Sequence, residues 1–119
     1  MKNLMDFFVD PLQGDSMQTA KFFVGQLIHH RLFDYRGVIV DVDPSFMLSE
    51  EWYQQIAKSR PAKDQPWYRV LVHNAIHETY VAESNLELDT ENEPISHPEV
   101  ANFFDAFVDG HYVMNIQTN

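Results

Sequence analysis

The sequence has no cysteine and only four glycines in 119 residues. The lack of cysteine excludes disulfides, zinc–thiolate sites and cysteine nucleophiles. There is also no phosphate-binding loop, no glycine-rich nucleotide turn and no G-x-S-x-G sequence. No apolar run approaches the roughly 18 residues of a membrane span. We therefore expect a protein that is not an enzyme, needs no cofactor and does not cross or bind a membrane.

Positive charge is missing from the last third of the chain. Residues 80–119 contain eight acidic residues and no Lys or Arg, whereas residues 20–79 contain seven of each sign, and the net charge is −10. A negative field repels nucleic acid and anionic membranes and attracts a basic partner. Asp6 and Asp10 interrupt the N-terminal apolar residues, which a signal peptide would not allow, so we expect a cytoplasmic protein.

Short strands separated by turn residues dominate what is present. Apolar residues make up 45% of the chain, enough for one packed core. The strand-like segments are Gln26–His30, Gly37–Asp43, Trp67–His73, residues 78–83 and residues 85–88. About five short antiparallel strands predict an all-β fold, a small SH3-like barrel spanning residues 20–93. Residues 1–19 are expected to form a mobile tail, with a docking strip that uses Phe7, Phe8 and Val9 as the alternative.

Alternation along two of these strands assigns their faces. In the second strand the three valines 38, 40 and 42 are predicted to face the core, while Ile39, Asp41 and Asp43 face water. Asp41 and Asp43 are thus read as solvated carboxylates rather than an acid–base pair. In the third strand Tyr68 is predicted to be core, and Trp67 to lie with Arg69 on the opposite, exposed face.

The connection from Ser45 to Pro66 is unusually long for a compact domain. Ser49 followed by Glu50 and Glu51 predicts the start of a short helix that carries Trp52 and Ile56. Connections longer than about 12 to 15 residues are usually functional or disordered, and we expect this one to form functional surface.

The C-terminal region has the pattern of an amphipathic helix over residues 94–110. Ser96 and Glu99 match a capping box, and Ile95 and Val100 match a hydrophobic staple. The apolar stripe comprises Val100, Phe103, Phe104, Phe107 and Val108. We expect this helix to end at Gly110, to pack on the barrel or on another chain, and to be followed by a tail over residues 111–119.

The histidines do not predict a metal site. His73 and His77 have helical ligand spacing but flank a hairpin, and the adjacent His29 and His30 face opposite sides of a strand. His30 is read as a partly buried hydrogen-bonding residue.

Aromatic and basic residues gather in the turn, the long connection and the start of the third strand. The candidate binding residues are Trp67, Arg69, Arg31, Arg36, Tyr35, Phe33, Trp52 and Lys63, with Tyr68 as a further aromatic of the group. Such a group stacks on a base, encloses a methyl group or clamps a peptide. Core packing is the alternative for each aromatic residue.

Six motifs carry a resemblance to a known family. In chain order over residues 20–100 they are "GQLIHH", "RGVIVDVDP", "EEW", "KDQPWYRVLV", "TYVAESNL" and "ISHPEV". Together they resemble the HspQ, or YccV-like, proteins, also called the hemimethylated-DNA-binding domain. The hairpin after the third strand and the segment 105–119 depart from the shared pattern.

The resemblance implies an SH3-like barrel, no catalysis and a stress-related role in the cytoplasm. It leaves two main functions open: an adaptor that helps an ATP-dependent protease such as Lon choose substrates, and a reader of hemimethylated DNA. Reading a methylated adenine would need an apolar cage rimmed by Arg31, Arg36 or Arg69. An aromatic cage for a methylated peptide is a third hypothesis, and a homo-oligomer is left open.

Overall fold

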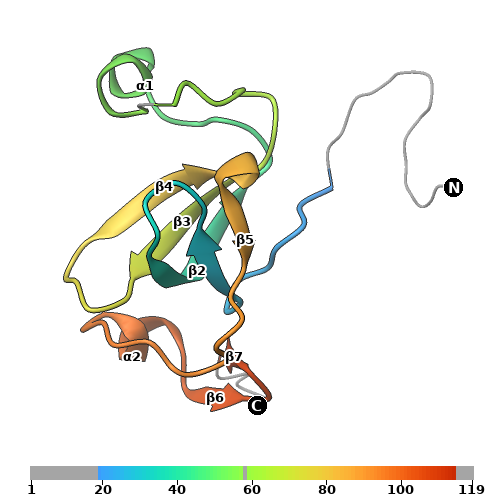
Figure 1. The fold of residues 1–119 in the computed structure, drawn as a ribbon, viewed down its shortest axis with the longest axis vertical. Helices are drawn as coiled ribbons and strands as arrows, with labels where there is room; N and C mark the ends of the chain where they lie inside the picture. Colours follow the sequence, from blue (N-terminus) through green and yellow to red (C-terminus); the bar gives the residue numbers. More distant parts are fainter. Residues whose placement is uncertain (1–18, 58, 115–119) are drawn as a thin grey trace, which may run out of the picture.

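The computed structural model describes residues 19–57 and 59–114. The elements are β1 (Leu27–His30), β2 (Arg36–Asp43), α1 (Glu50–Ile56), β3 (Trp67–Val72), β4 (Glu78–Ala82), a 3-10 turn η2 (Glu83–Asn85), β5 (Leu86–Leu88), α2 (Val100–Phe103), β6 (Ala106–Val108) and β7 (His111–Val113). Strands β4-β3-β2-β1-β5 form one antiparallel sheet, and β6 and β7 form a separate hairpin. In Figure 1 the sheet lies between α1 at one end and α2 with the hairpin at the other. The prediction of a mainly-β, barrel-like fold is confirmed.

Both faces of the sheet are buried, which differs from the expected pattern of one dry and one wet face. One apolar cluster includes Ile39, Tyr68 and Val70, and the other includes Val38 and Leu71. The prediction that Ile39 faces water is wrong, because it is fully buried. A register shift between Ile39 and Asp41 breaks the alternation in β2, so Val42 packs against the first cluster whereas Val38 belongs to the second.

Tyr68 is the buried anchor of the first cluster, as predicted. Its hydroxyl donates a hydrogen bond to Oε2 of the buried Glu83 at 2.6 Å and accepts one from the Phe22 amide at 3.2 Å. The same carboxylate oxygen accepts the Lys21 amide at 2.8 Å. Burial and the bond to Glu83 raise the pKa of the Tyr68 hydroxyl. These bonds fasten the segment before β1 across the start of β3.

The predicted C-terminal helix is not formed over residues 94–110. Helix α2 has four residues, and the chain then turns into β6 and β7. Asp109 and Gly110 both have positive φ, 52° and 85°, as a tight hairpin turn with Asp-Gly requires. The side chain of the N-cap residue Glu99 forms no capping hydrogen bond with α2. The Glu99 amide instead donates a hydrogen bond to Nδ1 of His97 at 3.0 Å. Asp109 and Gly110 therefore form the turn of a hairpin, and the prediction that Gly110 ends a helix is wrong.

The C-terminal hairpin covers the second face of the sheet. Tyr112 stacks on Phe104 at 5.3 Å, and both belong to the second apolar cluster. The Tyr112 amide donates to the Gly25 carbonyl at 2.8 Å. Gly25 has φ of 97°, and a Cβ there would lie 2.1 Å from the Tyr112 carbonyl oxygen. This close approach needs a glycine.

Parts of the predicted tails lie outside the described residues. This applies to residues 1–18 and 115–119, whereas residues 111–113 form β7 rather than a tail. Within the described ranges, no helix has the length and apolar character needed to cross a bilayer.

Candidate binding pocket

The long connection between β2 and β3 folds back over the sheet. Helix α1 begins as predicted, with the Ser49 hydroxyl accepting the Trp52 amide at 3.1 Å. Phe46 precedes this helix and meets the Trp67 ring edge-on, with 5.0 Å between ring centroids. Its centroid is 6.0 Å from that of the Tyr80 ring. Lys63, near the far end of the connection, pairs with Glu50. The connection is thus packed against β3 and β4 rather than extended into solvent.

Trp67 is buried by this connection, so the prediction that it is exposed is wrong. Only 1% of its surface is accessible. Its ring stacks on Tyr80 at 5.3 Å with an interplanar angle of 23°, and meets Trp52 edge-on at 6.2 Å. Its indole N–H donates to the Ala62 carbonyl at 3.3 Å. The alternation placed Trp67 on the correct face, but the long connection covers that face.

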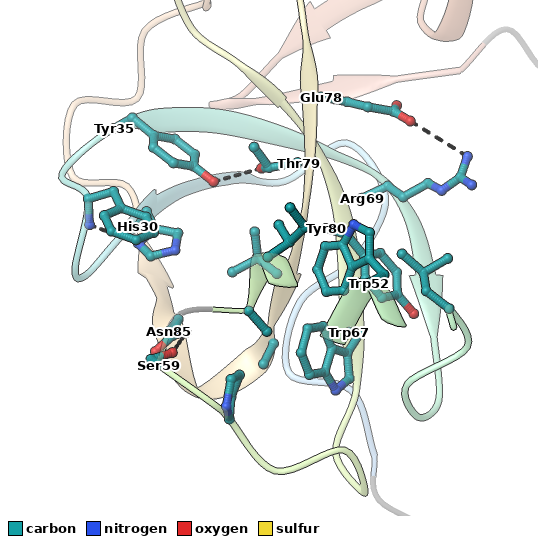
Figure 2. A pocket seen from close by; sticks show the side chains of 17 residues that line it. His30, Tyr35, Trp52, Ser59, Trp67, Arg69, Glu78, Thr79, Tyr80 and Asn85 are labelled. Atoms are coloured by element: carbon teal, nitrogen blue, oxygen red, sulfur yellow. Dashed lines mark hydrogen bonds and ion pairs between the residues drawn. The ribbon is translucent and has the colours of Figure 1, made fainter. Parts of the chain in front are cut away.

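A cavity of about 360 Å³ opens beside this aromatic packing. All five residues of β4 line it, together with α1 on one side and the turn between β1 and β2 on the other. Figure 2 shows Trp52, Trp67 and Tyr80 on one wall and His30 with Tyr35 across from them. This volume and aromatic lining are typical of a small-ligand or side-chain site.

His30 holds the turn that forms the second wall. It is 3% exposed, and its Nδ1 accepts the amides of Leu32 at 3.1 Å and Phe33 at 3.0 Å. Burial lowers the pKa of His30 and so favours the neutral ring. Because Nδ1 accepts hydrogen bonds, the hydrogen of the neutral ring is on Nε2. Figure 2 shows this second nitrogen on the side of the cavity. The predicted hydrogen-bonding role of His30 is confirmed, and the ring is buried more fully than the partly buried residue that was expected.

Two further bonds fix the turn. The Tyr35 and Thr79 hydroxyls are 2.6 Å apart and join the turn to β4. His29 bonds to Asp34 through Nε2 at 2.6 Å and to Glu87 through Nδ1 at 2.7 Å. The bonds to Asp34 first, and to Glu87 second, raise the pKa of His29. Because each ring nitrogen meets a carboxylate oxygen, the protonated form of His29 donates to both and joins the turn to β5.

The pocket gathers some of the predicted binding residues and leaves others out. Trp67, Trp52, Phe33, Tyr35 and Arg69 line it. Arg69 lies beside Glu78, with 3.8 Å between guanidinium and carboxylate.

The other predicted bases, Arg31, Arg36 and Lys63, do not line the cavity. The mostly buried Arg36 pairs with Asp89 at 3.1 Å, which ties the acidic segment after β5 to the sheet. Within the described ranges, no group of three potential ligands could hold a metal ion. The sequence interpretation missed Tyr80, although its place in the segment "TYVAE" put an aromatic residue on the strand paired with Trp67.

A family model described as "Hemimethylated DNA-binding protein YccV like" matches residues 20–111. The chain belongs to the YccV-like family. F-box only protein 21 of Homo sapiens and of Pongo abelii are each 35% identical to it over 98 residues, which is 81% of this YccV-like chain. The match covers 15% of the human relative and 16% of the orangutan one, so the chain spans about a sixth of the length of these curated relatives.

The two tryptophans should differ in their contribution to stability. Trp67→Ala removes a fully buried ring and should lower the free energy of unfolding by about 3 to 5 kcal/mol. Trp52 is half-buried, and Trp52→Ala should cost about 1 to 2 kcal/mol. Urea unfolding followed by circular dichroism measures both values, and equal losses would contradict the burial of Trp67.

The two adjacent histidines should titrate in opposite directions from the ordinary value of 6.5. Because the pKa of His29 is raised, its contribution to stability is present below pH 6.5 and is lost as pH rises through the raised pKa. The lowered pKa of His30 has the opposite effect, with stability lost as pH falls below 6.5.

Proton–nitrogen NMR of the imidazoles measures both midpoints. Asp34→Asn should bring the midpoint of His29 down toward its ordinary value and leave His30 below 6.5. One shared midpoint would contradict the assigned hydrogen bonds.

Proposed function

We propose that this YccV-like chain is a non-enzymatic adaptor that helps a cytoplasmic ATP-dependent protease of the Lon type select its substrates. The observation that supports it is the aromatic cavity with an apolar rim. Phe33 is 62% exposed and Ile56 is 54% exposed, and both line the opening. Exposed apolar side chains next to a cavity are typical of a surface that binds another protein.

The electrostatics favour a polypeptide partner over a nucleic acid. Arg36, Lys63 and Arg69 each lie beside a carboxylate of the chain itself. A phosphate would have to compete with that carboxylate for each base, and the net charge of −10 would oppose its approach. A basic polypeptide segment meets neither cost.

A turnover assay tests the adaptor role. A purified Lon-type protease degrades an unfolded substrate while the YccV-like chain is titrated in, and the rate should change and saturate. Trp52→Ala should need at least about tenfold more protein for the same change, because it removes one wall of the cavity. Phe103→Ala is the matched control, since this exposed ring lies on α2, away from the cavity.

A wild-type rate that does not respond would contradict the adaptor role. A Trp52→Ala response equal to that of the wild type would contradict the use of the pocket.

The family description favours a second candidate, the binding of hemimethylated DNA. An adenine methyl group lies in the major groove, and an aromatic cavity could enclose it or stack on an unpaired base. If the protein makes three phosphate contacts, its binding to DNA should weaken roughly 40-fold as the salt concentration rises from about 50 to 200 mM. Fluorescence anisotropy of hemimethylated and unmethylated duplexes at both salt concentrations tests this candidate, and equal affinities would contradict methyl recognition.

The cavity gives less support to a methylated-peptide cage. Glu78 is the one carboxylate among its lining residues, and it pairs with Arg69. A methylated ammonium group would therefore find no free negative charge within the cavity lining.

A further inference from the structure

Strand β4 is an edge of the sheet and presents unused main-chain groups. The hydrogen bonds from Val72 N to His77 O and from Glu83 N to Pro66 O fix which residues of this strand point toward β3. The main-chain groups of residues 77, 79, 81 and 83 point toward β3, so the main-chain groups of residues 78, 80 and 82 point away from it. None of these outward groups forms a hydrogen bond with another described residue.

The cavity lies along this edge. It is lined by every residue of β4, and its other walls come from α1 and from the turn after β1. No Lys or Pro occurs in β4 to protect the edge from pairing. A segment laid beside β4 would reach the outward main-chain groups and the aromatic walls at once.

His30 adds a donor to the same space. Its Nδ1 accepts two amides, and its Nε2 hydrogen has no acceptor within residues 19–57 and 59–114. The ring is almost wholly buried and its second nitrogen faces the cavity (Figure 2). A buried donor without an acceptor is costly, and the carbonyl oxygen of a bound segment would satisfy it.

We propose that β4 receives an extended segment of a partner polypeptide as an added strand, and that this segment inserts one large apolar side chain into the cavity. The outward amides and carbonyls of β4 hold the segment's main chain, while Trp52, Trp67 and Tyr80 hold the side chain. The negative charge of the chain favours a segment with basic residues on either side of the apolar one. The identity of the partner as a protease substrate rests on the proposed function, whereas the binding mode does not.

A peptide with one apolar residue tests the side-chain site. Ac-KTKTFTKTK-NH2 is basic and strand-forming, and calorimetry measures its binding to the full chain. Replacing its Phe by Ala should weaken binding at least about tenfold, as should Trp52→Ala in the protein, whereas Phe103→Ala should leave it within about twofold. Acidic ETETFTETE should bind more weakly than the basic peptide. Lack of binding by the basic peptide, or equal binding of the Phe and Ala peptides, would overturn the proposal.

Main-chain methylation tests the added strand. One peptide carries N-methyl groups on the two Thr that flank the Phe, and its matched control carries them on the two Lys next to those Thr. Successive amides of a strand point in opposite directions, so one pattern should weaken binding at least about tenfold and the other should be tolerated. Equal affinities for the two patterns would overturn strand addition, and so would a stable dimer in sedimentation that excludes the peptide.

The two proposals fail separately. A change in proteolysis without peptide binding would retain the adaptor role and overturn strand addition. Peptide binding with the expected methylation pattern but no change in proteolysis would retain strand addition and contradict the adaptor role.

Discussion

The packing of Trp67 against the connection between β2 and β3 is the interaction on which the candidate site depends. Helix α1 has seven residues and no buried side chain, so it has little stability of its own. It is held in place because Phe46 and Trp52 pack on the pair formed by Trp67 and Tyr80. Without this aromatic packing the connection would leave the sheet, and one wall of the cavity would be lost.

The opposite wall depends on polar bonds instead. His30 binds two amides of the turn, and Tyr35 shares a hydrogen bond with Thr79 on β4. One wall is therefore fixed by apolar burial and the other by hydrogen bonds, and both meet at the edge of the same strand. Three segments that are distant in sequence thus form one site, while the Arg36–Asp89 pair and the C-terminal hairpin stabilise parts of the sheet away from the cavity.

Local patterns predicted the parts of the fold that local physics determines. The strands, the Ser49 cap of α1 and the burial of Tyr68 followed from alternation, turn residues and capping chemistry. The errors occurred where tertiary contacts decide. Trp67 is buried rather than exposed because the connection between β2 and β3 covers it, and alternation does not describe the path of that connection.

Two other errors had related causes. A register shift in β2 changed which residues share a face, and Ile39 is buried although its neighbour Asp41 is exposed. The capping-box pattern at Ser96 competed with the hairpin signal of Asp109-Gly110, and the hairpin formed. Of the five aromatic residues predicted to group together, Phe33, Tyr35, Trp52 and Trp67 line the cavity, whereas Tyr68 lies in the first apolar cluster. Their role in binding stays a prediction. Charge alone could not reveal that Arg36 is already paired.

Amide NMR mapping of an unfolded substrate on the isotope-labelled chain shows whether a polypeptide binds at the cavity, because it reports the contacted face without any substitution. Polypeptide binding at the cavity predicts that shift changes concentrate in β4, α1 and the turn after β1, with the β6–β7 hairpin unaffected. Shift changes confined to the hairpin and α2, or none at saturating substrate, would contradict polypeptide binding at the cavity.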